Sequence, residues 1–304
     1  MISRSLPLRS IRSLRCWIIF AAALGAAPAL AQPPVTPTIA IIIDDVGYRR
    51  AEALRLIDIP APLTLSFLPF LPHTRDLALR AHGAGKEIML HIPMQNGLGT
   101  DLGPAGLTLS LNQDVFTDRL RRALRNIPYV RGLNNHTGSV LTQHRRPMEW
   151  TMQEVSRYPL YFVDSRTTAQ TVAQKVAQEY QIPNLARDVF LDHEISEEAV
   201  DREFKRLIRI ARKTGTAIAI GHPHEVTVSY LERELPKLGE QGVAIATISA
   251  LWMIRNNGVR PFDGRLPTAE LPEPVQPLPE QLVQATAEPE LAPARTIELG
   301  YSSQ

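Results

Sequence analysis

The chain has 304 residues, with 33 Lys and Arg against 31 Asp and Glu, and 44% of its residues are hydrophobic. It is therefore long enough for one substantial domain with a sizeable core, and its balanced charge argues against a nucleic-acid-binding surface. Its one cysteine, Cys16, excludes intrachain disulfides and leaves any metal to nitrogen and oxygen ligands.

The N-terminal segment has the pattern of a secretory signal. Four arginines (Arg4, Arg9, Arg12 and Arg15) precede the apolar stretch from Trp17 to Leu24, and Ala29-Leu30-Ala31 offers a cleavage site before Gln32. We expect residues 1–31 to be cleaved and the mature protein to be periplasmic or secreted. A membrane anchor is the alternative, but the apolar stretch is shorter than the roughly 18 residues expected of a spanning helix. After cleavage, 29 basic residues face 31 acidic ones, a net charge of −2.

Between residues 36 and 260, short β-branched runs alternate with amphipathic segments. The predicted strands are 39–43, 63–68, 87–91, 129–133, 160–163, 188–191, 217–220 and 243–247. Helical spacing is clear at 113–126, and Ser196 caps a helix that reaches Lys213 and ends at Gly215. Seven to eight β/α units of this length predict an α/β fold, a single-domain distorted (β/α) barrel with parallel strands, rather than an open doubly wound sheet. From residue 265 to 304, prolines and glutamates dominate, which predicts a disordered tail that is free to reach a protein partner.

Polar residues follow several of the predicted strands, where parallel strands bring them to one face. They are Asp44-Asp45, His91, Asn134-Asn135-His136, Asp164-Ser165-Arg166, Asp192-His193-Glu194 and Gly221-His222-Pro223-His224. Any one of them has a structural explanation, such as a helix cap or a hydrogen-bonded core histidine. Together they predict a site, and carboxylates with imidazoles fit a catalytic divalent metal, most simply Zn²⁺.

Adjacent side chains in an extended strand point to opposite sides, so we expect one carboxylate of Asp44 and Asp45 to bind the metal and the other to accept a proton. Other motifs fail. His224-Glu225 lacks the second histidine of H-E-x-x-H, there is no G-x-S-x-G, and the glycines from Gly97 to Gly103 have the wrong spacing for G-x-G-x-x-G. That last segment is predicted to be a flexible loop over the site.

The segments IIIDDVG, GKEIMLHIPMQ, GLNNHTGSVLT, FVDSRTT and AIAIGHPH resemble the divergent bacterial branch of the polysaccharide deacetylases, the NodB-like carbohydrate esterases, from Ile39 to about Trp252. The resemblance implies that Asp44 is the catalytic base and that Asp45 and His91 are metal ligands. Where the parent family has its second motif histidine, this chain has Gln95, and we infer that His136 supplies the third ligand.

The resemblance also implies that His222 is the general acid and that Asp164 orients it. The parent Arg-x-Pro-Tyr segment has no counterpart, so Asn134 and Asn135 are the candidate substrate-binding oxyanion donors. His193 and His224 stay outside this scheme, the first leading into the helix capped by Ser196 and the second at the rim of the cleft.

The implied activity is metal-assisted removal of N- or O-acetyl groups from a glycan, and export would make peptidoglycan an accessible substrate. Two alternatives stand beside it. The first is a catalytically inactive barrel that binds cell-wall glycan or a protein partner, which the loss of the second histidine favours. The second is metal-dependent hydrolysis of another bond, such as an amide or a phosphoester.

Overall fold

The computed structural model describes residues 36–258, so the predicted signal segment 1–31 and tail 265–304 lie outside the described residues and stay predictions. The strands of the described part form one sheet in which every hydrogen-bonded pair is parallel. In sequence order they are β1 (Thr38–Val46), β2 (Thr64–Phe67), β3 (Glu87–Met94), β4 (Val130–Thr137), β5 (Tyr161–Asp164), β6 (Asn184–Ala186), β7 (Val189–Phe190), β8 (Thr216–Gly221) and β9 (Ala244–Ile245).

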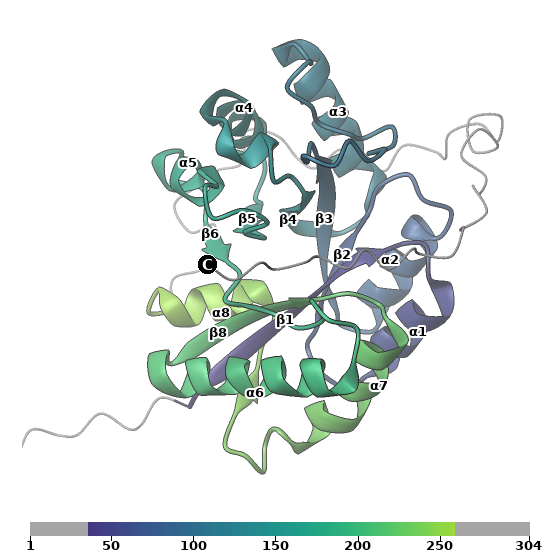
Figure 1. The fold of residues 1–304 in the computed structure, drawn as a ribbon, viewed down its shortest axis with the longest axis vertical. Helices are drawn as coiled ribbons and strands as arrows, with labels where there is room; N and C mark the ends of the chain where they lie inside the picture. Colours follow the sequence, from purple (N-terminus) through teal and green to yellow (C-terminus); the bar gives the residue numbers. More distant parts are fainter. Residues whose placement is uncertain (1–35, 259–304) are drawn as a thin grey trace, which may run out of the picture. The chain divides into compact units, whose positions relative to one another are not determined.

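Helices connect these strands and cover the sheet (Figure 1). They are α1 (Arg50–Asp58), α2 (Thr74–Gly83), α3 (Gln113–Asn126), α4 (Arg145–Val155), α5 (Ala173–Glu179), α6 (Glu197–Thr214), α7 (Glu225–Glu234) and α8 (Ile248–Arg255), with short 3-10 helices at Leu141–Gln143 and Leu235–Lys237. Within residues 36–258, no helix combines the length and apolar character needed to cross a bilayer.

The sheet curls into a distorted barrel. Its strand order is β6-β5-β4-β3-β2-β1-β8-β7, with β9 paired to β1. The two ends of this path, β6 and β7, are joined by only two residues, Arg187 and Asp188. A two-residue link cannot cross a flat sheet of this width, so the sheet bends until its edges meet. The predicted fold class is confirmed, although β6 was not anticipated from the sequence.

Alternation along the strands divides the apolar residues between two layers. In β1, Ile39, Ile41 and Ile43 pack in the large outer cluster, together with residues from the surrounding helices. Ala40 and Ile42 pack in a second, inner cluster with residues such as Met89, Val163 and Ile220. A strand that is buried on both faces has a continuous run of apolar residues, which is why β1 contains five in succession, from Ile39 to Ile43.

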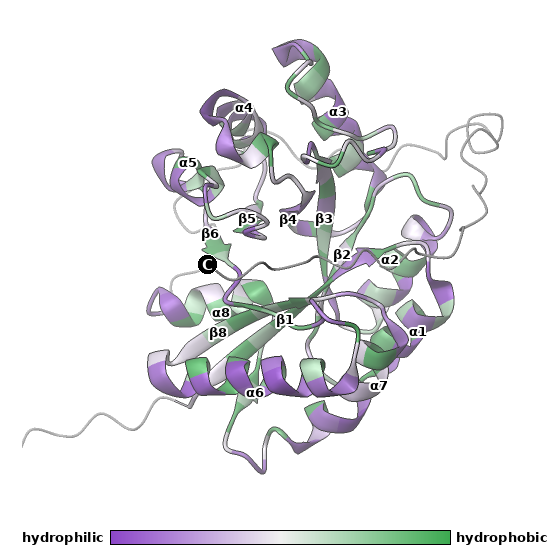
Figure 2. Cartoon of the chain, viewed as in Figure 1, coloured by the Kyte–Doolittle hydropathy of each residue, from purple (hydrophilic) through white to green (hydrophobic). Residues whose placement is uncertain are grey.

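Charged and polar residues cover the outward faces of the helices, while the strands are hydrophobic (Figure 2). Helix α6 shows how the sequence determines such an element. The Ser196 hydroxyl accepts a hydrogen bond from the Ala199 amide at its start, and Gly215 ends it with a positive φ of 88°. Phe204, Leu207 and Ala211 form its buried stripe.

A buried carboxylate anchors α8 at the amino ends of the strands. Glu87, at the start of β3, accepts hydrogen bonds from the hydroxyls of Thr64 and Tyr161 and from the backbone amide of Ser249. The Ser249 hydroxyl donates to the same carboxylate. These four hydrogen bonds to one carboxylate fix α8 against β3.

Candidate metal centre and catalytic groups

The two adjacent aspartates lie in a β-bulge at the carboxyl end of β1. The register between β1 and β2 shifts between Ile43 and Val46, and Asp45 has a positive φ of 56°. Asp44 continues the inward-facing series of Ala40 and Ile42, whereas Asp45 would point outward in a regular strand. Because the bulge turns Asp45 back, both carboxylates reach the same centre, and the expectation that they point to opposite sides is wrong.

Asp45, His91 and His136 form a compact group of potential metal ligands. Asp45 Oδ1 lies 3.3 Å from His91 Nε2 and 2.9 Å from His136 Nδ1, and the two ring nitrogens are 3.1 Å apart. The register of β3 against β4 explains this, since His91 pairs with Asn134 and Pro93 with His136. Residues 134 and 136 of β4 thus share the face on which His91 lies.

Asn134 contacts both Asp44 and His91 and has no exposed surface. Its Nδ2 donates to Asp44 Oδ1 at 2.8 Å and to Ser165 Oγ at 3.1 Å, while its Oδ1 accepts from Ser66 Oγ at 2.6 Å. Oδ1 also lies 2.8 Å from His91 Nδ1. Since an amide oxygen only accepts, His91 Nδ1 carries the proton and its Nε2 lone pair faces Asp45 and His136.

These residues fit a metal ion. The buried Oδ1 of Asp45 has no hydrogen bond of acceptable geometry, although two imidazole nitrogens lie close to it. The three ligand atoms are 2.9 to 3.3 Å apart, near the separation of about 3.4 Å that four ligands at ~2.1 Å from a tetrahedral Zn²⁺ would have. A histidine ligand that donates its other ring N–H to an acceptor is typical of metal sites, and His91 does so to Asn134.

The two carboxylates have opposite electrostatic character. Burial raises the pKa of Asp44, which is only 2% exposed, even though His91, His222 and Asn134 counteract the shift. Burial acts in the same direction on Asp45, but the neighbouring imidazoles of His136 and His91 outweigh it and hold the pKa of Asp45 below its ordinary value. Asp45 therefore stays ionised as a ligand, whereas Asp44 has the higher proton affinity that suits a base.

His222, directly after β8, is held by Asp192 and not by Asp164. Its Nδ1 lies 2.9 Å from Asp192 Oδ1, and its backbone N–H donates to Asp192 Oδ2 at 2.6 Å. Burial acts to lower the pKa of His222, but Asp192, with help from Asp44 and Asp45, raises it to about 9. With Nδ1 bound to Asp192, the Nε2 proton faces the centre, 3.9 Å from Asp45 Oδ2.

The predicted role of Asp164 is corrected by the structure. Its carboxylate accepts hydrogen bonds from the amides of Arg166 and Gln174 and from the hydroxyl of Thr171. Asp164 lies two residues after Phe162, so both side chains point to the outer face of β5. The Asp164 side chain therefore lies among the residues that lead into α5. It caps that segment and does not contact His222.

Comparison with known proteins identifies the family of this chain. Residues 41–252 match the model of the divergent polysaccharide deacetylases, which covers more than half of the sequence. The chain belongs to the divergent polysaccharide deacetylase family. The resemblance predicted from the motifs is thereby confirmed.

Relatives of this deacetylase-family protein include two uncharacterized bacterial proteins. YibQ of Escherichia coli K12 is 37% identical over 211 residues, 69% of this chain, and the aligned part spans 66% of YibQ, slightly under two thirds of its length. A protein of Haemophilus influenzae Rd is 34% identical over 249 residues, 82% of this chain and 86% of its own length. The crystal structure of an uncharacterized protein of Agrobacterium tumefaciens C58 has a TM-score of 0.68 and 27% identity, covering 71% of this chain and 89% of that one.

Asn134 and Asn135 of this family member are engaged inside the protein, which corrects their predicted role as oxyanion donors. The Nδ2 of Asn135 donates to the Thr137 carbonyl at 2.7 Å, and its Oδ1 accepts from the Ser165 amide at 3.0 Å. The Nδ2 group of Asn134 donates to Asp44 and to Ser165. Both asparagines position other groups.

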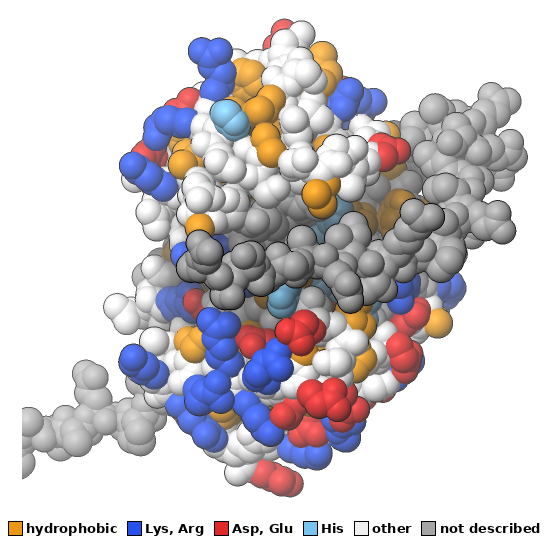
Figure 3. Space-filling model, viewed as in Figure 1, with side chains coloured by type: hydrophobic (Ala, Val, Ile, Leu, Met, Phe, Trp, Pro, Cys, Tyr) orange, Lys and Arg blue, Asp and Glu red, His pale blue; other side chains and the backbone are white. Residues whose placement is uncertain are grey.

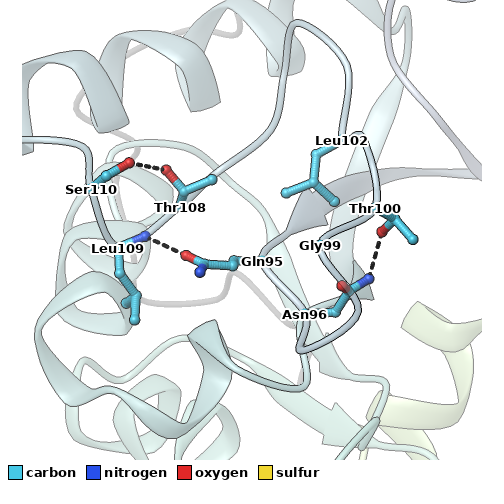
Figure 4. A pocket seen from close by; sticks show the side chains of 8 residues that line it. All are labelled: Gln95, Asn96, Gly99, Thr100, Leu102, Thr108, Leu109 and Ser110. Atoms are coloured by element: carbon cyan, nitrogen blue, oxygen red, sulfur yellow. Dashed lines mark hydrogen bonds between the residues drawn. The ribbon is translucent and has the colours of Figure 1, made fainter.

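Gln95 takes no part in the centre either (Figure 4). Its Oε1 accepts a hydrogen bond from the Leu109 amide at 2.8 Å, and it lines a cavity of about 530 Å³ with Asn96, Thr100, Thr108 and Ser110. The loop predicted over the site forms part of this cavity through Gly99 and Leu102, while its flexibility stays a prediction.

His224 and His193, which the predicted mechanism did not use, lie near His222. His224, Asp192 and His222 form a second group of potential ligands, but the Asp192 oxygens already accept hydrogen bonds from His222 and from the Thr227 hydroxyl. Burial lowers the pKa of His224. His193 is exposed, and its ring lies 6.3 Å from that of Phe190.

Proposed function

We propose that this protein is an exported, metal-dependent hydrolase that removes N- or O-acetyl groups from a glycan of the cell envelope. The family supports an acetylated carbohydrate as the substrate class. The observation that carries the proposal is the convergence of Asp44, the Asp45, His91 and His136 triangle and His222 at one end of the strands. Export rests on the predicted signal segment.

A divalent metal, most simply Zn²⁺, held by Asp45, His91 and His136 supplies a Lewis acid that activates water and polarises an acyl carbonyl. Asp44 accepts the proton of the attacking water, because burial raises its pKa and Asn134 fixes both its oxygens. The water oxygen forms a bond to the acyl carbon. His222 donates its Nε2 proton to the leaving nitrogen or oxygen as the bond from that atom to the acyl carbon breaks.

His222 suits the role of acid in the free protein. With a pKa of about 9 it is protonated at neutral pH, and Asp192 keeps the imidazolium in place through Nδ1. After the reaction, acetate and a free amine or hydroxyl remain. The proton accepted by Asp44 and the proton lost by His222 restore the starting charges once they exchange with solvent.

The cavity that starts directly after the carboxyl end of β3 supports a sugar substrate. It begins four residues after His91 and is lined by amide and hydroxyl side chains, including Asn96, Thr100 and Ser110. Neutral polar groups of this kind are suited to hydrogen bonds with sugar hydroxyls. In Figure 4, Gln95 and Thr108 face this cavity from the opposite side to Thr100.

The first experiment measures metal content and acetate release in the same preparations. We expect about one divalent ion per chain in the wild type, loss of the ion in His91→Ala and His136→Ala, and retention in His193→Ala, which removes an exposed histidine outside the triangle. Asp44→Asn should keep the ion and lose acetate release from N-acetylated chito-oligosaccharides, O-acetylated xylan or peptidoglycan fragments.

The outcomes separate the proposal from its alternatives. No bound metal after reconstitution with Zn²⁺ would refute the hydrolytic mechanism. A bound ion and glycan binding without turnover of any acetylated substrate would favour the inactive, glycan-binding barrel.

A further inference from the structure

Two arginines lie at the seam where the barrel closes, and the mechanism above does not use them. Arg187 is one of the two residues between β6 and β7, and Arg166 follows β5. The side chain of Arg187 donates from Nε to the Ser165 carbonyl at 2.7 Å and from Nη2 to the Arg166 carbonyl at 2.9 Å. These bonds fix its guanidinium in one orientation and leave Nη1 without a protein acceptor among residues 36–258.

This arginine pair, Arg166 and Arg187, lies next to the catalytic groups. The Arg187 guanidinium sits 5.2 Å from the centroid of the Phe190 ring, whose edge packs against His222 at 5.3 Å between ring centroids. Ser165, whose carbonyl holds Arg187, receives a hydrogen bond from Asn134 through its hydroxyl. Arg166 lines a cavity of about 560 Å³ that also contains Thr168, Lys175 and other polar side chains.

Neither arginine forms an ion pair within the described part of the chain, although the charges of Asp44 and Asp164 act on Arg187. The Arg166 side chain donates only to the neutral Gln174 side chain, at 3.2 Å, and Asp164, which lines the same cavity, accepts the hydrogen bonds described above. Arg55 shows the contrast, because it is paired with both Glu225 and Glu232. Burial, followed by the positive charge of Arg166, lowers the pKa of Arg187, while Asp44 and Asp164 act in the opposite direction.

The surrounding surface carries further basic residues, several of which are paired with acids, as Arg206 is with Glu203. Figure 3 shows Lys and Arg side chains gathered over α6, near the histidine side chains at the centre of the view. One of the α6 arginines, Arg206, lies close enough to Arg187 to contribute to its lowered pKa. A guanidinium that is held in place beside a site and forms no ion pair of its own is suited to binding an oxyanion.

We propose that Arg166 and Arg187 form a subsite for an oxyanion carried by the glycan, so that the substrate is an acidic acylated glycan and not a neutral one. This inference rests on the proposed function in one respect, namely that the substrate is a glycan. A carboxylate or a phosphate on a sugar next to the acylated one offers the planar or trigonal oxygen arrangement that the guanidinium groups match.

Isothermal titration calorimetry on the metal-loaded full chain tests this directly. The probes are a tetrasaccharide of alternating N-acetylglucosamine and glucuronate, its neutral carboxyl methyl ester, and N-acetylglucosamine 6-phosphate. We expect the acidic tetrasaccharide to bind about tenfold more tightly than the ester, because a charge-assisted pair is formed only with the acid. Preference for the phosphate over unmodified N-acetylglucosamine, without preference for the acidic tetrasaccharide, would support the subsite and assign phosphate as its ligand.

Variants identify the residues responsible. Arg166→Ala and Arg187→Ala should each remove most of the tenfold preference, and Arg187→Lys should restore only part of it because ammonium lacks the bidentate fork. Arg122→Ala is the matched control, since it removes one exposed arginine from α3 that pairs with Asp118. If Arg187→Ala fails to fold because the seam opens, Arg166→Ala still decides the question, because its side chain makes no bond to the seam.

Two results would overturn the subsite. The first is equal affinity of the wild type for the charged and the neutral probes. The second is that Arg166→Ala and Arg187→Ala still prefer the acidic probe as strongly as the Arg122→Ala control does. Acetate release distinguishes this failure from failure of the proposed function. Equal turnover of acidic and neutral substrates leaves the hydrolase and removes the subsite, whereas charge-dependent binding without turnover leaves the subsite and removes the hydrolase.

Discussion

Replacing Asp192 with Asn should lower the pKa of His222 while preserving the shape of its pocket. In the wild type, the His222 amide and the Thr227 hydroxyl donate to Asp192 Oδ2 at 2.6 and 2.8 Å. The side-chain oxygen of the introduced asparagine can still accept both hydrogen bonds. The new amide group would face His222 Nδ1, which lies 2.9 Å from Asp192 Oδ1. An N–H donor there matches only an unprotonated Nδ1, so the imidazolium loses its main partner.

The size of the effect follows from the pKa of about 9 against the ordinary 6.5. Removing Asp192 leaves burial, which lowers the pKa, partly offset by Asp44 and Asp45, so we expect a value near or below 6.5. A fall of about 2.5 pKa units corresponds to ~3 kcal/mol between the two protonation states.

The pH dependence has a defined sign. A histidine whose pKa is higher in the folded than in the unfolded state contributes stability that is fully present below pH 6.5 and is lost as the pH rises through about 9. Asp192→Asn should therefore reduce the free energy of unfolding by ~3 kcal/mol more at pH 5.5 than at pH 10.

Urea denaturation of metal-free protein at both pH values measures this difference, and an NMR titration of the His222 ring measures the pKa itself. Asp188→Asn is the control, because Asp188 also accepts a hydrogen bond from a backbone amide of β8, that of Ile218, but contacts no histidine. Equal destabilisation by Asp192→Asn at the two pH values, or a His222 that still titrates near 9, would show that Asp192 does not hold the proton on this ring.

Three further predictions concern buried contacts. Gly132→Ala should destabilise the fold by about 1–3 kcal/mol in urea denaturation, since a Cβ would lie 2.2 Å from the buried Tyr161 ring, whereas Gly83→Ala, with no atom within 4 Å, should be neutral or slightly stabilising. Glu87→Gln should cost about 1–3 kcal/mol because an amide cannot accept from all the donors around Glu87, and exposed Glu240→Gln should cost nothing measurable. Asn134→Ala should raise the pKa of Asp44 further, observable by NMR titration of the metal-free protein, and an unchanged pKa would contradict the role assigned to Asn134.

Much of the centre could be predicted from the sequence because parallel strands bring their carboxyl ends together. The order of the elements placed His91, His136 and His222 at strand ends together with other polar residues, and the resemblance to the deacetylases singled them out as site residues. Helix 113–126 was found to the residue, and the helix capped by Ser196 was found to within one residue of its end, because their periodicity and caps are local signals.

The error at Asp164 was avoidable in principle. In β5, Tyr161 and Val163 pack in the inner cluster and Phe162 in the outer one, so Asp164 has to face outward. In β8, Ile218 and Ile220 face inward, so His222 faces inward as well. Leu191 faces outward, so the next residue, Asp192, also faces inward. Comparing the parity of each strand would have favoured Asp192 over Asp164.

Other features depend on contacts that no local pattern encodes. The β-bulge that turns Asp45 inward is set by the pairing of β1 with β2, and the seam that orients Arg187 exists only once the sheet has curled. Short β6 lacks the length and alternation that identify a strand from sequence, so its three residues were missed.

Asn134 explains how a centre without the parent family's arginine segment keeps its base and a ligand in register. An arginine could donate to Asp44, but it has no acceptor for the Nδ1–H of His91. The amide of Asn134 does both, donating to Asp44 Oδ1 at 2.8 Å and lying with its own Oδ1 2.8 Å from His91 Nδ1. One neutral side chain therefore fixes the orientation of the base and the tautomer of the ligand at once, without adding a charge to a fully buried position. Asp44 and His91 are thus both ordered from β4 in a chain that lacks the arginine segment.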